Sequence, residues 1–154
     1  MGIFRALEIS ASGLTAERLR QDVISNNLAN ADTTRATLGP DGRWQPYRRQ
    51  VAVFQERQSF DTVLGSAMQQ DGGTPQPTGN GVRVTAILED SQPFQQRYDP
   101  GNPDADAGGY VLIPNVNPVT EMVDLMTASR AYEANVNAIN ATRDMALKAL
   151  EIGR

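Results

Sequence analysis

The chain has 154 residues, a formal net charge of −4 and a pI near 4.8, so it is sized for one domain and lacks the basic face of a general nucleic-acid binder. Hydrophobic residues make up 40% of the sequence and aromatic residues only 6%, which is a thin supply of large side chains for a compact core. Cysteine and histidine are absent, which excludes disulfide scaffolds, thiolate metal sites and Ser-His-Asp or Cys-His catalysis.

The first residues predict neither a cleaved signal peptide nor a lipid anchor. Arg5 and Glu8 interrupt the apolar residues, and the sixth residue is alanine where a myristoylation signal has serine or threonine. Apolar runs also fall short of the roughly 20 residues that span a bilayer. We therefore expect a protein that is not inserted into a membrane.

The first predicted element is a helix from Ile3 to about Asn30, roughly 40 Å long. Apolar residues recur at three- and four-residue spacings, and Gly13 weakens the middle by about 1 kcal/mol relative to alanine. The helix ends in a run that is unusual because asparagine is a poor helix former. This run is Asn26, Asn27, Leu28, Ala29 and Asn30. Asn30 suits a left-handed C-cap, but capping does not explain the other amides.

Residues 32–117 predict a small β-rich module, because short β-branched or aromatic runs alternate there with glycine- and proline-rich turns. The expected strands are Tyr47–Phe54, Val82–Leu88 and Tyr110–Ile113. Residues 55–80 predict a mobile surface loop, with one helical turn at 62–69. Arg48 and Arg49 could meet an anionic partner, but we interpret them as a solvated face.

A second helix is predicted from Pro118 to about Ile152, roughly 50 Å long, since proline suits its first turn and Gly153 its end. A heptad seam runs along it at alternating spacings of three and four. The seam consists of Met122, Leu125, Ser129, Tyr132, Val136, Ile139, Arg143, Ala146 and Leu150. The small β module cannot cover so long a helix. The predicted fold class is therefore α+β, with residues 1–31 and 118–154 pairing as a coiled coil and residues 32–117 inserted between them.

The second helix repeats the asparagines of the first, at Asn135, Asn137 and Asn140. Buried amides in paired helices fix the register at a cost in stability. The many alanines of this helix have two readings: alanine is the best helix former, or its small side chain lets the helix pack against other copies. We expect the asparagines to set the register within an assembly.

Two long motifs resemble a known family. N-N-L-A-N-A-D-T, beginning at Asn26, is similar to the N-terminal signature of bacterial flagellar rod and hook proteins. V-N-P-V-T-E-M-V-D-L-M-T-A-S-R-A-Y-E-A-N-V-N-A-I-N-A-T-R-D-M, beginning at Val116, resembles their C-terminal motif, and Tyr98–Val116 is similar to the proximal-rod members. The motif positions of the C-terminal helix are Glu121, Met122, Leu125, Ser129, Arg130, Tyr132, Glu133, Asn135, Val136, Asn137, Ile139 and Asn140.

The resemblance implies a structural subunit without enzymatic activity, cofactor, metal, nucleic-acid ligand or small-molecule substrate. The terminal helices would form the inner layer of a helical tube in the periplasm, which transmits torque from motor to hook and conducts exported subunits. The implied partners are other copies, related rod proteins, an adaptor subunit, the MS ring and the flagellar type III export apparatus. Export would need no cleaved signal. Residues 55–80 are longer than the family pattern requires.

Other functions are weaker predictions. Asn102, Asp104 and Asp106 have the spacing that begins an EF-hand, but Ala107 and Ile113 occupy the positions that need glycine and glutamate. We expect these residues to form turns, and nothing around the carboxylates suggests acid–base catalysis. The remaining alternative is a soluble coiled-coil adaptor or chaperone with a β insert, which would form a discrete oligomer.

Overall fold

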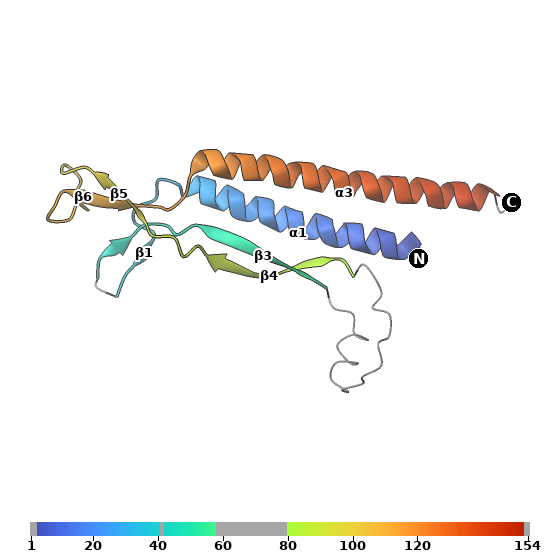
Figure 1. Ribbon diagram of the computed structural model, residues 1–154, viewed down its shortest axis with the longest axis horizontal. Coiled ribbons are helices and arrows are strands. Elements are labelled where there is room, and N and C mark those ends of the chain that lie inside the picture. The colour runs from blue at the N-terminus through green and yellow to red at the C-terminus, as the bar shows by residue number, and fades with distance from the viewer. Residues whose placement is uncertain (1–2, 41, 58–79, 153–154) are drawn as a thin grey trace, which may run out of the picture. The chain divides into compact units, whose positions relative to one another are not determined.

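The computed structural model describes residues 3–40, 42–57 and 80–152 of the chain (Figure 1). In sequence, two long helices flank six short strands in this described part. The elements are α1 (Ile3–Ala29), β1 (Thr37–Leu38), β2 (Trp44–Gln45), β3 (Gln50–Glu56), β4 (Val82–Glu89), β5 (Gln95–Tyr98), β6 (Tyr110–Ile113) and α3 (Pro118–Ile152). The α+β class predicted from the sequence is confirmed.

Side-chain caps explain where the helices begin and end. Before α3, Oδ1 of Asn117 accepts hydrogen bonds from the backbone N–H groups of Val119 at 3.0 Å and Thr120 at 3.4 Å. Pro118 follows as the first helical residue, where its missing N–H costs nothing. At the end of α1, the carbonyl of Asn26 accepts hydrogen bonds from both the backbone N–H of Asn30 at 3.1 Å and the side-chain Nδ2 of Asn30 at 2.9 Å.

The chain divides into two compact units. Unit 1 comprises residues 1–19, 53–86 and 129–154, and unit 2 comprises residues 20–52 and 87–128. In unit 1, α1 contacts β4 through Ser12, whose Oγ accepts a hydrogen bond from Val82 N at 3.0 Å, and contacts α3 through Gly13. In unit 2, Asn27 contacts both β3 and α3. Within each unit, α1 therefore lies between α3 and the β3–β4 pair.

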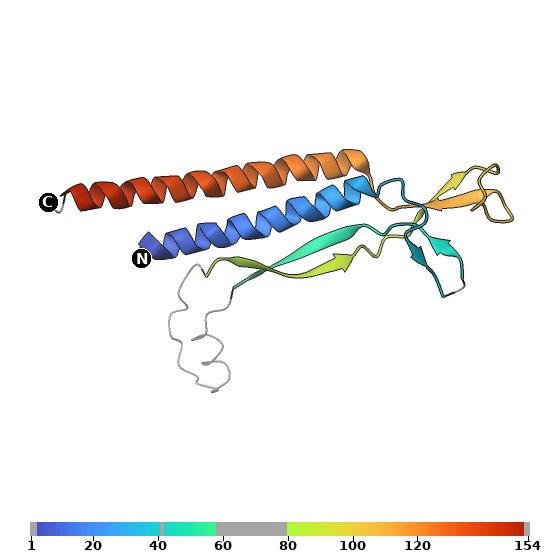
Figure 2. The same ribbon diagram turned by 180° about the vertical axis from the view of Figure 1, so that it is seen from behind.

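The two helices run antiparallel and side by side within each unit (Figures 1 and 2). In unit 2, Asn27 of α1 donates to Glu121 of α3 at 3.1 Å. In unit 1, Gly13 of α1 faces Asn135 of α3 so closely that a Cβ on the glycine would lie 2.9 Å from the amide oxygen. In both contacts the residue numbers sum to the same value, so α1 and α3 have the same antiparallel sequence register in each unit. The partners also lie two heptads apart on each helix, the repeat expected of a coiled coil.

The strands form three two-stranded sheets: β1 with β2, β3 with β4, and β5 with β6. The β5–β6 pair is antiparallel, with Gln95 opposite Ile113 and Tyr98 opposite Tyr110. Two backbone hydrogen bonds bracket the β3–β4 pair, from Asp90 N to Arg49 O at 2.8 Å and from Arg57 N to Gly81 O at 3.0 Å.

The predicted strands are mostly correct in place. β6 has the predicted bounds, β4 extends one residue further, and β3 begins three residues later than expected. The sequence analysis missed β1, β2 and β5. Most of the predicted loop at 55–80, including the helical turn at 62–69, lies outside the described residues.

The buried apolar core of the described residues is small, as the composition predicted. It consists of Ala16, Val23, Ile24, Val111, Val116 and Ala128. Several large apolar side chains remain exposed instead, and α3 carries more of them than any other single element of the described residues. The fold consequently depends on specific polar contacts as well as on hydrophobic burial.

Candidate functional site

The asparagine run at the end of α1 is anchored by one buried amide. Asn27 is only 1% exposed, and its Nδ2 donates to Gln50 O at 2.8 Å and to Glu121 Oε2 at 3.1 Å. Its Oδ1 accepts from Gln50 N at 2.9 Å and from the Tyr47 hydroxyl at 3.0 Å. Both donors and both lone pairs of the amide are therefore used within the chain. Asn27 sets the register of α1 against β3 and α3.

A buried charge pair completes this polar centre of unit 2. Glu121 is 0% exposed, and its Oε1 lies 2.6 Å from Nε of Arg49. The other guanidinium nitrogens reach Asp90 at 3.4 Å and Asp124 at 3.5 Å. Burial lowers the pKa of Arg49, but the hydrogen bond and charge of Glu121 outweigh it, so the pKa is raised. Breaking such a pair leaves a buried charge without a partner, which costs several kcal/mol.

Arg49 corrects the expectation of a solvated face at the start of β3. Its backbone N–H also donates to Asn115 Oδ1 at 2.8 Å, and Nδ2 of Asn115 donates to Gln92 O at 3.1 Å. Arg48 lies 4.4 Å from the ring centroid of Phe94, within cation–π range. Two adjacent arginines give no local signal of this, because their partners lie 41 to 75 residues away in the sequence.

The remaining amides of the N-terminal motif form a turn after α1. Nδ2 of Asn30 donates to Oδ1 of Asn26 at 3.0 Å, and Thr33 donates to Oδ1 of Asn30 at 3.2 Å. Nδ2 of Asn26 reaches the hydroxyl of Tyr47 at 3.1 Å. Burial, followed by the charge of Glu121, raises the pKa of Tyr47. Of the other motif residues, Leu28 is half-buried and Ala29 is exposed.

The three asparagines of α3 have different surroundings. Asn135 faces Gly13, and its Nδ2 donates to the carbonyl of Ala131 at 3.0 Å. Asn137 and Asn140 are exposed. At 100° per residue, they lie on the side of α3 that points away from α1. Only these two remain available to another molecule.

The helix contact uses a face of α3 that is shifted from the predicted seam. The contact stripe keeps four predicted positions, and its other four precede the predicted ones by one residue. Glu121 and Asn135 contact α1 directly, and extending their spacing along the helix gives the stripe Glu121, Leu125, Ala128, Tyr132, Asn135, Ile139, Thr142 and Ala146, all of which are buried or half-buried. The predicted members Met122, Arg143 and Leu150 are instead exposed, and Ser129 and Val136 are half-buried. The four shifted positions are small or polar, namely Glu121, Ala128, Asn135 and Thr142, so a search for an apolar seam passes over them.

An exposed apolar face covers the first turns of α3. Val119, Met122, Val123 and Met126 are 49% to 70% exposed, and their spacing places them on one side of the helix. Buried Glu121 lies on the other side. Arg130 and Glu133 follow the apolar face and are also exposed. A contiguous apolar face of this kind is typical of a protein–protein contact.

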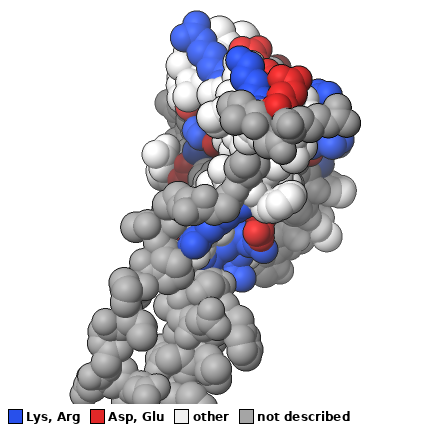
Figure 3. Space-filling view, turned by 90° about the vertical axis from the view of Figure 1, so that its right-hand side faces the viewer, with Lys and Arg blue, Asp and Glu red and all other residues white. Residues whose placement is uncertain are grey.

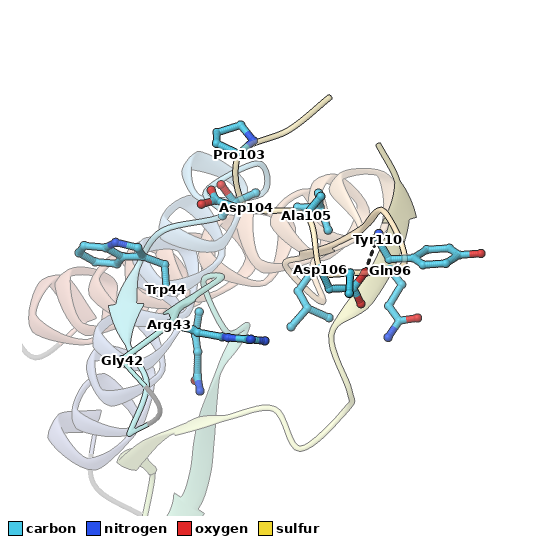
Figure 4. A pocket seen from close by; sticks show the side chains of 14 residues that line it. Gly42, Arg43, Trp44, Gln96, Pro103, Asp104, Ala105, Asp106 and Tyr110 are labelled. Atoms are coloured by element: carbon cyan, nitrogen blue, oxygen red, sulfur yellow. Dashed lines mark hydrogen bonds between the residues drawn. The ribbon is translucent and has the colours of Figure 1, made fainter. Parts of the chain in front are cut away.

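A cleft of about 620 Å³ lies in unit 2 between the β1–β2 turn and the loop before β6 (Figure 4). The acids that line it stabilise turns. Oδ1 of Asp106 accepts from Gly108 N at 2.8 Å and Tyr110 N at 3.0 Å. Asp104 accepts two hydrogen bonds from the Arg35 guanidinium, each 2.7 Å long.

The EF-hand-like residues therefore act as turn formers, as predicted. Oδ1 of Asn102 accepts from the backbone N–H of Asp104 at 3.0 Å, which closes a local turn. Among the described residues, no group of three or more acidic side chains is arranged to hold a metal ion. The helices of this described part also include none that is long and apolar enough to cross a membrane.

Two segments of the chain match protein-family models, and both models describe the same class of protein. Residues 7–37 match the family model "Flagella basal body rod protein", and residues 107–152 match "Flagellar basal body rod FlgEFG protein C-terminal". The first match contains the asparagine motif, and the second contains the whole of α3. The paired helices and their polar centre are therefore those of a flagellar basal-body rod protein.

Relatives that match over their full length identify one family within this class of protein. The chain is 52% identical to the flagellar basal-body rod protein FlgC of Bacillus subtilis, with all of both chains covered. It is 46% identical to the FlgC protein of Borreliella burgdorferi, with 99% of this chain and 98% of the relative covered, and 42% identical to that of Salmonella typhimurium over all of both chains. The chain belongs to the FlgC family of flagellar basal-body rod proteins. These are structural subunits of the basal body that assemble with other rod components, and the family is not known for enzymatic activity.

Proposed function

We propose that the chain is a subunit of the proximal rod and polymerises through its terminal helices into a helical tube. The tube transmits torque from the motor to the hook and conducts exported subunits. The observation that carries this proposal is the exposed apolar face at Val119, Met122, Val123 and Met126. The chain buries few large apolar side chains, yet exposes a continuous row of them on a helix of the family's C-terminal motif.

The polar centre of unit 2 suits a subunit that transmits torque, because it resists sliding of the elements that it joins. Asn27, Arg49 and Glu121 join α1, β3 and α3 through hydrogen bonds of 2.6 to 3.1 Å. Sliding any one element would leave a buried charge or amide without its partner, at about 1–3 kcal/mol for each group. Register among the three elements is consequently fixed within the subunit before neighbours are added.

Register between subunits is assigned to a separate pair of amides. Asn137 and Asn140 are exposed on the side of α3 that points away from α1. They are free to pair with amides or backbone groups of a neighbouring subunit. In this proposal residues 1–31 and 118–154 form the inner coiled-coil domain, and residues 32–117 form the module inserted between them.

The neighbours follow from this place in the rod. They are other copies, related rod proteins, the adaptor subunit at the export gate and the MS ring. The subunit reaches the periplasmic rod through the flagellar type III export apparatus. Nothing in this role requires a cofactor, a nucleic acid or a small-molecule substrate.

The proposal is tested by expressing the chain in a bacterium that lacks its own FlgC. We expect restored swimming and recovery of the chain in purified basal bodies. The Met122→Glu, Met126→Glu double variant should be folded and secreted but absent from basal bodies, because charges would replace the apolar contact. Ala138→Glu, at an exposed site of α3 beyond the apolar face, is the matched control and should still be incorporated. Normal incorporation of the double variant would refute the role of the apolar face.

A further inference from the structure

We infer that a groove between α1 and the β3–β4 pair of unit 1 binds the last turns of α3 from a second copy of the chain. This inference rests on the proposed function and deepens it, because it names one contact between subunits. Groove and ligand are different surfaces of the same chain. The contact is therefore heterologous, and a heterologous contact can repeat from subunit to subunit, as a polymer requires.

The groove has a volume of about 310 Å³ and combines an apolar floor with a basic rim. α1 contributes small side chains, which leave space above the helix, and β4 contributes two valines. The lining residues are Ser12, Thr15, Ala16, Leu19, Arg57, Val82, Arg83 and Val84. Such a groove accepts aliphatic side chains and favours carboxylates beside them.

Arg57 of the rim forms an exposed ion pair within the chain. Nη1 of Arg57 lies 3.3 Å from Glu8, and both side chains are about half-exposed or more, at 45% and 68%. An exposed pair of this kind contributes little stability and exchanges readily for another carboxylate. Arg5 lies nearby in the same unit and donates to Asn80 at 3.4 Å. Basic side chains gather around a smaller acidic area on the face shown in Figure 3.

The last turns of α3 have the complementary chemistry. The helix register places Ile3, where described α1 begins, opposite Met145, so Leu147 and Leu150 have no described α1 residue beside them. Their side chains are 48% and 72% exposed. Asp144 and Glu151 are neighbours of Leu147 at i−3 and i+4, so two carboxylates flank the leucines. Arg143 and Lys148 add two positive charges in the same turns, so the charge match depends on which side chains face the groove.

The α3 helix of the same chain cannot fill the groove. In unit 1, Gly13 of α1 faces Asn135 of α3, whereas the adjacent Ser12 bonds to β4. Adjacent residues of a helix point about 100° apart, so α3 and the groove lie on different sides of α1. The occupant has to come from a second copy.

The test uses disulfide cross-linking, for which this cysteine-free chain gives a clean background. Cells lacking their own FlgC would make two versions of the chain together, Thr15→Cys and Leu147→Cys, and basal bodies would be isolated and oxidised. We expect a linked dimer of the two versions, identified by peptide mass spectrometry. It should be about tenfold more abundant than with Met145→Cys in place of Leu147→Cys, because docking raises the effective thiol concentration. Met145 is exposed on a different side of the same helix.

A charge reversal checks the same contact independently. Arg83→Glu in the Thr15→Cys version should reduce the linked dimer about tenfold, and adding Glu151→Arg to the Leu147→Cys version should restore it. Equal cross-linking with the Met145→Cys control, or linkage to another rod protein in place of a second copy, would overturn the inference. If cells that express the parent chain swim and the chain enters basal bodies, but no specific dimer forms, this inference fails while the proposed function stands. If the parent chain never enters basal bodies, the proposed function fails.

Discussion

At the scale of single residues, Asn27 joins three elements through one side chain. The variant Asn27→Ala removes four hydrogen bonds and leaves polar groups of Gln50, Tyr47 and Glu121 without this partner. We expect the free energy of unfolding to fall by about 3 kcal/mol or more, since each buried unpaired group costs about 1–3 kcal/mol. Urea unfolding measures the change. Asn137→Ala, at an exposed asparagine, is the control and should change it by less than about 0.5 kcal/mol.

Gly81 is a second residue with one defined role. It adopts a φ of 79°, and a Cβ added there would clash with Oγ of Ser12. Gly42 has a φ of 70°, but a Cβ added there would meet nothing within 4 Å, so Gly42→Ala measures the backbone cost alone. We expect Gly42→Ala to cost about 1–2 kcal/mol and Gly81→Ala to cost more. Hydrogen exchange at the amide of Val82 should accelerate only in Gly81→Ala. Equal effects of the two variants would show that Ser12 does not hold β4 in place.

Sequence reasoning identified Asn27 and Glu121 as motif residues but not their contact. They lie 94 residues apart, and no local periodicity connects them. The asparagine run did indicate that amides were needed, because propensity alone disfavours them in a helix. Whether an amide serves its own chain or a neighbour depends on burial, which the sequence does not give. Asn27 is buried and Asn137 is exposed, although both belong to similar runs.

At the scale of elements, the turn that precedes β6 depends on ionised aspartates. The hydrogen bonds from Tyr110 and Gly108 lower the pKa of Asp106, and the hydrogen bond from Arg35 lowers the pKa of Asp104. A lowered pKa in the folded state gives stability that is present above the unfolded value, about 3.9, and is lost as the pH falls through the folded value. We expect the β5–β6 hairpin to loosen below about pH 4.

The measurement is a pH titration of the backbone amide signals of Gly108 and Tyr110 by NMR. In Asp106→Asn the amide oxygen can still accept the two N–H bonds but does not titrate. The pH dependence of these two signals should therefore shrink, while the effect of Asp104 on Arg35 remains. An unchanged titration in Asp106→Asn would assign the pH response to another group.

The sequence predicted the elements that have a long hydrophobic periodicity. It missed the short strands, which are formed by pairing with a neighbouring strand and have no periodicity of their own. α1 and α3 each carry many periodic positions, so their bounds were predicted closely. β1 and β2 have only two residues each, too few to show alternation. β5 reads Gln-Gln-Arg-Tyr and is exposed throughout. It is stabilised by pairing with β6 and by the edge-to-face contact of Tyr98 with Tyr110, with ring centroids 5.3 Å apart.

At the scale of the whole molecule, one side of α3 makes contacts within the chain and another side is exposed for contacts with other molecules. One side contacts α1 through small and polar residues, and the opposite side presents apolar residues followed by Asn137 and Asn140. The Asn137→Leu, Asn140→Leu double variant should keep or raise the stability of the isolated subunit, because leucine is the better helix former. It should lower incorporation into basal bodies and swimming, because neighbouring polar groups would lose their partners.

The readout is swimming together with the amount of secreted subunit, so that a failure of export is not mistaken for a failure of assembly. Ala138→Leu is the matched control, since it adds a leucine at another position of α3. Normal swimming of the double variant would mean that these amides face solvent in the rod. Register between subunits would then depend on the apolar face beginning at Val119.

The equal sequence offset of the Gly13–Asn135 and Asn27–Glu121 contacts constrains how the chain can change length. One residue inserted into α1 between these contacts would rotate everything beyond it by about 100° and advance it by about 1.5 Å. No loop lies between the two positions of α1, which the structure describes throughout, to absorb that change. Such an insertion would have to be matched by one in α3 between Glu121 and Asn135. The lengths of α1 and α3 between these contacts are therefore coupled. Unmatched insertions are expected to be tolerated only in the segments that connect the two helices.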